Sequence, residues 1–371
     1  KARVAAFLGV GKPFDLREYD VPDPAPGEAL LRVERANVCG SDLHMWRGDL
    51  DLASIGVVWP VVMGHEFVGR VEKLGTGRTA DSAGAALAEG DRVAFPYFLG
   101  CGRCRACGRG APNACPMALA HMLRPCEFAP HFVGGFADRY LVADRQPLFR
   151  VPDGVDAALA AGANCALAQV LFGLHRANLR MGETVAIQGA GGLGIYATCV
   201  AREMGAGKII VLDGVPARLD LARACGADEV VDIREYADPR ARSARVQALT
   251  DGWGADVVCE LVGTPAAIPE GLRMLAPEGR YLEIGNISPK QKFECDPAWL
   301  VMRSITIVAC VLYPPWALRA ALEFLDRARA RYPLDRIASQ TYPLAEIDHA
   351  FRAGDALRGS DAGVVRASIV P

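Results

Sequence analysis

The chain has 371 residues, of which 51% are hydrophobic, and its formal net charge is −2. That length is typical of about two domains, each with enough apolar material for a core. The nearly balanced charge gives no electrostatic basis for binding nucleic acid or an anionic membrane. Uncharged apolar runs of about 18 residues, which a membrane helix needs, are lacking. The start of the chain also lacks the apolar core of a secretory signal, so we expect a cytoplasmic protein.

The first part of the chain is rich in predicted strands. Residues 1–75 contain short apolar runs between glycine and proline turns, a pattern typical of a β-sandwich or barrel. Residues 78–90 are small and polar, which indicates an exposed loop, and a cysteine-containing lobe follows at 100–136. Residues 137–151 return to strand character.

From about residue 160 the pattern changes. Short apolar runs alternate with helical stretches, as in TVAIQ before LGIYATCVAREMGA and KIIVLD before PARLDLARACGA. This alternation predicts a parallel sheet of βαβ units. After Tyr313 we expect two helices, ALRAALEFLDRARA and AEIDHAFRAG, and a closing strand, AGVVRASIV. Because no linker is evident, we expect the two domains to share a long interface.

A glycine-rich motif follows the apolar run Val185–Gln188 and opens a helical stretch; it reads Gly189-Ala190-Gly191-Gly192-Leu193-Gly194. The first glycine of such a motif allows a tight turn, the second lets the backbone approach a pyrophosphate, and the third lets the helix pack on the sheet. Backbone N–H groups at the start of the helix then hold the phosphates. The motif therefore predicts a dinucleotide site, and the alternative is a glycine turn without a ligand.

Asp213 ends the next apolar run about 20 residues further on, where an acidic side chain binds the ribose hydroxyls. A carboxylate at this place repels a 2′-phosphate, so we expect NAD rather than NADP. Arg218 lies close enough in the sequence to weaken that preference, and we count it among the cofactor-binding candidates.

Four of the 12 cysteines are clustered, with the spacing Cys101-x2-Cys104-x2-Cys107-x7-Cys115. Four thiolates can close a tetrahedron around Zn²⁺ and leave no position open, so the cluster predicts a structural zinc site. An iron–sulfur cluster also uses four cysteines, but the ending of the ferredoxin motif is absent here.

Three further stretches contain candidate metal ligands: Cys39-Gly40-Ser41-Asp42-Leu43-His44, Gly64-His65-Glu66, and Cys165 in AGANCALAQ. Each is ambiguous alone, because a single cysteine is usually a small buried hydrophobe. Together with GDRVAF, the four-cysteine lobe and NLRMGETVAIQGAGGLG, their order and spacing resemble the zinc-containing medium-chain dehydrogenase/reductase family, alcohol dehydrogenase type. The resemblance covers essentially the whole chain.

The resemblance implies an α/β fold of two parts. A GroES-like, β-rich catalytic domain is expected at 1–166, and a Rossmann domain with a doubly wound parallel sheet at 167–308. Residues 309–371 are expected to return to the catalytic domain.

The resemblance also implies a set of ligands. Cys39, His65 and Cys165 match the three protein ligands of a catalytic zinc, and they leave the fourth position open. Polyol-type relatives often have a carboxylate where this chain has Cys165, which favours the alcohol type. Glu66 matches a residue that lies behind the ligands or serves transiently as the fourth.

The implied chemistry is hydride transfer between an alcohol and NAD, with zinc as a Lewis acid on the alcohol oxygen. Ser41 matches the hydroxyl that takes the alcohol proton, and His44 matches the residue that relays it through the cofactor ribose to solvent. An unperturbed histidine pKa of about 6.5 suits that role. Asp42 matches a carboxylate that orients the zinc-bound imidazole of His65. The expected cofactors are NAD and zinc, with one catalytic and one structural ion per subunit.

The substrate pocket is less sharply predicted. By the resemblance, Trp46, Tyr97 and Phe98 fall beside the zinc, and core packing is the alternative. Two stretches, 78–90 and 116–136, look longer than in many relatives. We expect the second, which contains Phe128, His131 and Phe132, to form a lid over the cleft or a subunit contact.

Two other functions stay open. A polyol or amino-alcohol dehydrogenase would keep zinc and NAD, whereas a non-catalytic NAD-binding protein on the same fold would be expected to lose a ligand or relay residue. The expected partner is a small alcohol or carbonyl compound. Because the family commonly pairs the strand near 304–312 across a two-fold axis, the resemblance implies a homodimer or homotetramer.

Overall fold

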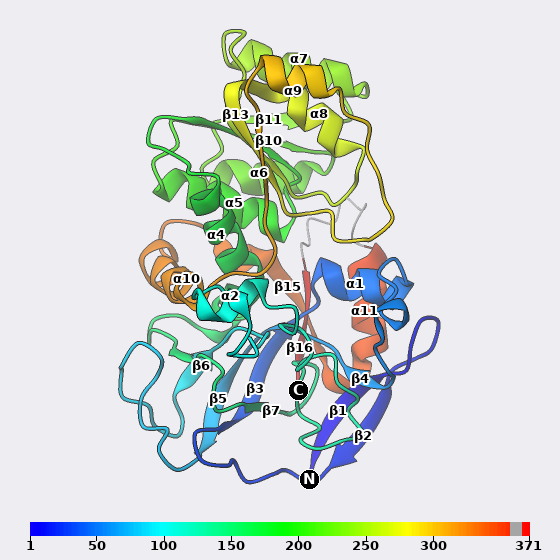
Figure 1. Ribbon diagram of the computed structural model, residues 1–371, viewed down its shortest axis with the longest axis vertical. Coiled ribbons are helices and arrows are strands. Elements are labelled where there is room, and N and C mark those ends of the chain that lie inside the picture. Colours follow the sequence, from blue (N-terminus) through cyan, green and yellow to red (C-terminus); the bar gives the residue numbers. More distant parts are fainter. Residues whose placement is uncertain (357–365) are drawn as a thin grey trace.

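The computed structural model of the protein describes residues 1–356 and 366–371. One part of the molecule is built on a parallel sheet and the other on mainly antiparallel strands (Figure 1). The predicted α/β class, with a β-rich part and a doubly wound parallel sheet, is confirmed.

The parallel sheet has the strand order β11-β10-β9-β12-β13-β14. The chain order therefore reverses between β9 and β12, and the carboxyl ends of these two strands open a crevice in which such sheets bind ligands. β10 is buried along nearly its whole length, as expected for a strand covered on both faces. The strands are β9 (Thr184–Gln188), β10 (Lys208–Asp213), β11 (Glu229–Asp232), β12 (Ala255–Glu260), β13 (Leu275–Glu283) and β14 (Thr306–Ala309).

Helices connect these strands. The first of them starts directly at the glycine motif, with Gly191 as its N-cap. Two others begin with an aspartate side chain, Asp238 or Asp296, that accepts a backbone N–H and is followed by proline, a combination that favours helix initiation. The helices are α5 (Gly192–Glu203), α6 (Pro216–Ala224), α7 (Pro239–Leu249), α8 (Ala267–Met274) and α9 (Pro297–Met302).

The β-rich part contains a three-stranded sheet and a seven-stranded sheet. The C-terminal strand β16 pairs with β3 near the start of the chain, and Figure 1 shows it among the N-terminal strands. The strands are β1 (Ala2–Phe7), β2 (Asp15–Tyr19), β3 (Ala29–Asn37), β4 (Val61–Val62), β5 (Glu66–Leu74), β6 (Arg92–Ala94), β7 (Arg139–Val142), β8 (Phe149–Arg150), β15 (Ala338–Pro343) and β16 (Arg366–Val370). The predicted domain boundaries at 166 and 308 remain predictions.

Apolar side chains from both ends of the chain form the core of the β-rich part. Phe67, Phe95 and Tyr140 are fully buried, and each ring lies within 5.0 Å of another. This packing fixes β5 against β6 and β7, so the residue that precedes β5, His65, has a rigid support.

The remaining helices are α1 (Gly40–Arg47), α2 (Arg105–Gly108), α3 (Ala157–Ala160), α4 (Ala168–Arg176), α10 (Pro315–Ala328) and α11 (Ile347–Ala356), with a π-helix, η3 (Ala163–Leu167). Short 3₁₀ turns lie at Ala53–Ile55, Pro112–Ala114, Leu334–Ile337 and Leu344–Glu346.

The end of the chain follows the prediction only in part. Both expected helices are present, as α10 and α11. The strand expected near 304–312 is confined to Thr306–Ala309, and the backbone is outside the extended region at both ends of the expected stretch, with φ +53° at Ser304 and +56° at Leu312. The closing strand starts at Arg366, and residues 362–365 of the predicted strand lie outside the described residues.

The expectation that apolar runs of membrane-helix length are lacking is wrong: residues 157–176 form the one helical run, among the residues described, that is long and apolar enough to cross a membrane. In the fold, 67% of its apolar window is buried inside the protein. Packing between the two parts of the molecule therefore accounts for its composition.

Candidate active site

A cleft of about 1120 Å³ lies between the two parts of the molecule. The parallel sheet supplies the turns after β9, β10, β12 and β13, and the β-rich part supplies α1 and the segments around His65 and Tyr97. Predicted site residues that line the cleft are Cys39, Ser41, His44, His65, Tyr97, Cys165, Gly189, Gly191, Gly192, Leu193, Asp213 and Arg218.

Three candidate metal ligands meet in this cleft. Cys39, His65 and Cys165 each offer one ligand atom, these atoms lie within 4.8 Å of one another, and all three residues are buried. The cysteine thiols share a hydrogen bond, which holds the pKa of Cys39 well below its usual value and that of Cys165 well above it. Two sulfurs and one imidazole nitrogen are a donor set that fits Zn²⁺ and leaves a fourth position open.

Asp42 fixes two of these ligands at once. Cys39 is the N-cap of α1, and its backbone N–H donates to Asp42 Oδ2 (2.9 Å). The other oxygen, Oδ1, lies 3.1 Å from His65 Nδ1 and accepts its N–H. Burial lowers the pKa of His65, but the adjacent Asp42 carboxylate outweighs this effect and raises it well above the usual value. His65 Nε2 is thereby turned toward the cleft, where Ser41 Oγ lies 2.9 Å from it.

Cys165 lies in the π-helix η3, which the sequence did not reveal. Its neighbour Asn164 is fully buried; its side chain accepts the N–H of Phe67 (3.2 Å) and donates to the carbonyl of Phe95 (3.1 Å). The hydroxyl of Tyr313 donates to the Asn164 carbonyl. These bonds tie the segment of Cys165 to the strands beside His65. The one feature of the sequence that could have indicated this role is the polar residue Asn164 inside the apolar run AGANCALA.

Glu66 lies behind the ligands and is fully buried. Burial raises its pKa to about 7, although the guanidinium of Arg366, which forms an ion pair with it, acts in the opposite direction. Arg366 also lies against the glycine motif: a Cβ on Gly192 would come within 2.5 Å of its Nε. The sequence did not single out Arg366, although it links Glu66 to the dinucleotide motif.

The predicted relay residues both line the cleft. Ser41 contacts His65 as described, and His44 Nδ1 lies 3.0 Å from Asp49 Oδ2. Of the three predicted aromatic residues, Tyr97 lines the cleft, and its ring centroid lies 4.8 Å from that of His65.

Trp46 and Phe98 do not line the cleft in the part of the chain that the structure describes. The Trp46 ring lies 6.0 Å from that of Phe351, and the Phe98 ring lies 5.2 Å from that of Tyr313. Both side chains therefore pack in the core, which was the alternative to a place in the pocket. The sequence could not indicate this, because the partners Phe351, on α11, and Tyr313, after β14, are distant along the chain.

The lobe at 116–136 reaches the cleft through different residues from those expected. Phe128 is 64% exposed, His131 stacks on Tyr19, and Phe132 is buried in a separate apolar cluster. Instead, the turns soon after Cys115 supply the apolar wall of the cleft, with Leu119, Met122 and Leu123. Gln169, one helical turn after Cys165, is a further lining residue that the sequence did not indicate.

The glycine motif and Asp213 form the other half of the cleft. Gly189 has φ +94°, and a Cβ on Gly194 would collide with the Gly189 carbonyl, so both positions require glycine. Asp213 Oδ2 accepts the N–H of Ala190 (2.7 Å), and Oδ1 accepts that of Val215 (2.9 Å). The carboxylate is thus held fixed at the mouth of the glycine turn.

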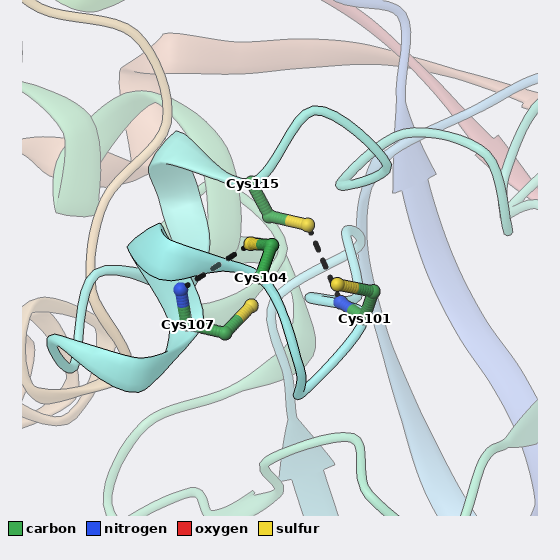
Figure 2. Close-up of side chains that lie close together, drawn as sticks. All are labelled: Cys101, Cys104, Cys107 and Cys115. Atoms are coloured by element: carbon green, nitrogen blue, oxygen red, sulfur yellow. Dashed lines mark hydrogen bonds between the residues drawn. The ribbon is translucent and has the colours of Figure 1, made fainter.

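The four clustered cysteines meet outside this cleft. Figure 2 shows the side chains of Cys101, Cys104, Cys107 and Cys115 turned toward one another, and their sulfurs lie within 4.8 Å of one another. Backbone N–H groups lower the pKa of Cys101 to about 6, and they also lower that of Cys104. Burial raises the pKa of Cys107 to about 11. Four sulfurs around one point fit a closed tetrahedral Zn²⁺ site.

Comparison with known proteins places the chain in a family. Residues 25–153 match the alcohol dehydrogenase GroES-like domain, and residues 192–327 match the zinc-binding dehydrogenase domain. The chain is 33% identical over 335 residues to 5-exo-hydroxycamphor dehydrogenase of Pseudomonas putida, with 90% of each chain covered. The chain belongs to the zinc-containing alcohol dehydrogenase family of medium-chain dehydrogenases. It is therefore an oxidoreductase of the type that acts on alcohols.

Other members of this family show the range of its substrates and cofactors. The chain is 30% identical to erythritol/L-threitol dehydrogenase of Mycolicibacterium smegmatis, with 96% of this chain and 94% of that one covered. An alcohol dehydrogenase structure from Thermotoga maritima superposes with a TM-score of 0.90 at 27% identity, with 100% and 99% covered. A structure of a zinc-binding dehydrogenase of Sinorhizobium meliloti bound to NADP has a TM-score of 0.80 at 27% identity, with 100% of this chain and 99% of that one covered.

Proposed function

We propose that the chain is an NAD-linked, zinc-dependent dehydrogenase of apolar alcohols. The observation that carries this proposal is the meeting of Cys39, His65 and Cys165, from three distant segments, at one buried point of the cleft that Asp213 and the glycine motif also line. A ligand set with an open position next to a dinucleotide site is the arrangement that alcohol oxidation requires.

Two zinc ions are proposed for each subunit. Cys39, His65 and Cys165 would hold the catalytic ion, and the four clustered cysteines the structural ion. When bound, the catalytic ion supplies Lewis acidity that lowers the pKa of an alcohol oxygen. Asp42 orients the His65 imidazole through their 3.1 Å hydrogen bond. Glu66, buried behind the ligands, is proposed to balance their charge together with Arg366.

Ser41 and His44 are proposed to carry the proton away from the alcohol. The Ser41 hydroxyl lies 2.9 Å from His65 Nε2, so it is close to the position where an alcohol oxygen would lie. The His44 side chain is mostly buried at 15% exposure and contacts Asp49, which is 42% exposed. His44 thus lies between the cleft and solvent, as a proton relay requires.

NAD is the proposed cofactor. The buried carboxylate of Asp213, held by two backbone N–H groups, is placed to accept hydrogen bonds from ribose hydroxyls and to repel a 2′-phosphate. The glycine motif and Asp213 would hold the dinucleotide, and NAD, when bound, would supply the hydride acceptor. Arg218 also lines the cleft and would interact with the same part of the cofactor.

The proposed substrate is an apolar alcohol, such as a cyclic secondary alcohol. Leu119, Met122 and Leu123 form one wall beside Tyr97, and Leu312 lies in the same lining. A polyol would bury its extra hydroxyl groups against these side chains without hydrogen-bond partners, which costs free energy. The alternative substrate is a polyol, which the similarity to erythritol/L-threitol dehydrogenase favours.

A cytoplasmic homodimer or homotetramer is also proposed. Strand β14 pairs with β13 on one side only, among the residues described, and its exposed side chains include Ile307 at 44%. An exposed strand edge with apolar side chains is suited to pairing with a second copy of the chain.

Removal of either ligand set is expected to remove a different zinc ion. Cys39→Ser should lose about one zinc per chain and nearly all alcohol oxidation, because two protein ligands hold Zn²⁺ poorly. Cys104→Ser should lose the other zinc, and exposed Cys295→Ser should keep both. Metal analysis and NAD reduction with cyclic secondary alcohols and linear polyols measure these effects. Wild-type turnover by Cys39→Ser would disprove the catalytic assignment, and absence of turnover with every alcohol would favour a non-catalytic NAD-binding protein.

His44→Gln is expected to slow turnover with little change in KM. The loss of a proton-relay group lowers kcat on the order of a hundredfold, and added imidazole should restore part of it. His349→Gln, on an exposed side chain of α11, is the matched control. Steady-state kinetics would contradict the relay if the two variants behaved alike.

Asp213→Asn is expected to shift cofactor preference toward NADP. The amide still accepts a backbone N–H but loses the negative charge, which should change the NAD/NADP ratio of kcat/KM by about tenfold to a hundredfold. Asp220→Asn, exposed on α6, is the control. An unchanged ratio, measured with one alcohol at saturating concentration, would show that Asp213 does not select the cofactor.

Ile307→Lys is expected to weaken the assembly, because a charge in a buried strand–strand contact lacks a partner. Sedimentation velocity should show a dimer or tetramer for the native chain and a smaller species for the variant. Val58→Lys, at a residue 63% exposed elsewhere, should leave the assembly intact. A monomeric native chain would rule out the proposed oligomer.

A further inference from the structure

Two acidic residues end neighbouring strands of the parallel sheet. Glu260 is the last residue of β12 and Glu283 the last of β13, and they are directly paired in the register of the two strands. Glu260 is fully buried, with 0% exposure. Because side chains at paired positions on one face lie close together, two carboxyl groups are held next to each other in a region from which water is largely excluded.

Hydrogen bonds connect this pair to two turns. Glu260 Oε1 accepts the backbone N–H groups of Val262 and Gly263, both at 2.8 Å. The amide of Asn286 donates to Glu260 Oε2 (3.0 Å) and to Glu283 Oε1 (3.1 Å), and its backbone N–H also donates to Glu283 Oε1 (3.1 Å). The carboxyl pair therefore ties the turn after β12 to the turn after β13.

Two oxygens in this network lack a donor. Glu283 Oε2 and Asn286 Oδ1 are buried and have no hydrogen-bond partner among the described residues. One oxygen of each carboxyl group lies around the same nitrogen, Asn286 Nδ2, at 3.0 Å for Glu260 and 3.1 Å for Glu283. Two carboxylates cannot bond, since both only accept, but a carboxylic acid can donate to a carboxylate. A proton on Glu260 would therefore allow this carboxyl group to donate to the Glu283 carboxylate, which still has an oxygen without a donor.

The charged groups around the pair come from several elements. Glu283 acts on Glu260, and Cys259 and Glu270 act on the neighbouring Tyr281. From α4, Arg176 donates to the carbonyl of Ala309 (2.9 Å), the β14 residue paired with Glu283. Glu270, on α8, is already paired with Arg242 of α7, at 2.7 Å. From β9 the facing side chain is Gln188, which is neutral and bonds to the Tyr281 hydroxyl. Burial, followed by the charge of Glu283, raises the pKa of Glu260 to about 8.

The two turns that the pair connects form part of the cleft wall. Its lining includes Val262 and Gly263 after β12, and Gly285 and Ile287 after β13. The packing is tight, because a Cβ on Gly285 would meet both the Glu260 carboxyl group and the Gly263 N–H, the latter at 2.6 Å. A movement of the carboxyl groups therefore moves the cleft wall.

We propose that Glu260, protonated and hydrogen-bonded to Glu283, is a positioning residue that holds the two turns in the arrangement that binds the dinucleotide. This inference rests on the proposed function, in which the cleft binds NAD. Loss of the proton places two carboxylates side by side with no cation between them, and their repulsion separates the turns. Dinucleotide binding is strong while the proton is present and weakens as the pH rises past the point at which Glu260 ionises.

The pH dependence has a definite sign. Glu260 ionises with a pKa of about 8 in the folded chain, above the usual value of 4.5. Stabilisation from its protonated form is complete below the lower value and is lost as the pH rises through the higher one. If only the protonated form binds well, the NADH dissociation constant should be nearly constant from pH 6 to 7 and rise up to about tenfold by pH 9.

The test uses the zinc-loaded chain and NADH as the probe. Glu260→Gln resembles the protonated form at every pH, so its NADH dissociation constant, measured by fluorescence, should match the native value at pH 7 and stay nearly constant to pH 9. Glu283→Gln removes the repulsion from the other side and should behave in the same way if the first variant folds poorly. Glu278→Gln, exposed on the same strand, should keep the native pH profile.

A second measurement does not depend on cofactor binding. The difference between the infrared spectra of the native chain and of Glu260→Gln, in which the contribution of Glu66 cancels, should show the carbonyl band of a protonated carboxyl group at pH 7, and this band should disappear with a midpoint near pH 8. Lack of this band, or a native-like rise of the dissociation constant in both glutamine variants, would overturn the role of Glu260. If the band is present but NADH fails to bind at any pH, the proposed function fails while the shared proton stands.

Discussion

The buried ion pair between Glu66 and Arg366 is the interaction on which the arrangement of the cleft depends. Glu66 follows the ligand His65 on β5, whereas Arg366 begins the C-terminal strand and packs against Gly192 of the glycine motif. Either charge alone would be costly at this depth, because a buried ion without its partner loses its hydration and gains nothing in return. The pair therefore links the metal ligands, the last strand and the dinucleotide turn, and it explains why the two parts of the molecule meet here.

Local patterns in the sequence were sufficient for much of the fold and the site. The alternation of apolar and helical runs gave the parallel sheet, because strands buried on both faces must be continuously apolar, as β10 is. Short-range chemistry was equally informative. The spacing of the four cysteines anticipated their convergence, and the glycine motif anticipated a turn in which Gly194 leaves no room for a side chain.

Features that depend on long-range contacts were not visible in the sequence. Arg366 and Asn164 acquire their roles only when distant strands bring Glu66 and Phe67 beside them. For the same reason Trp46, predicted in the pocket, packs against Phe351 instead. Glu260 and Glu283 each end an ordinary strand, and only the register of β12 and β13 makes them neighbours. A motif specifies the chemistry of a residue, whereas the partner of a buried charge is decided by topology.

The pairing of β16 with β3 has a consequence for biosynthesis. Residues 66 and 366 are 300 positions apart, so Glu66 has no counter-ion from Arg366 until 300 further residues have been synthesised. The parallel sheet, whose strands lie between residues 184 and 309, can form as a unit before then. The β-rich part, although it is synthesised first, is thus the part that is completed last, and the nascent chain must keep an acidic group and an open sheet edge away from unwanted contacts in the meantime.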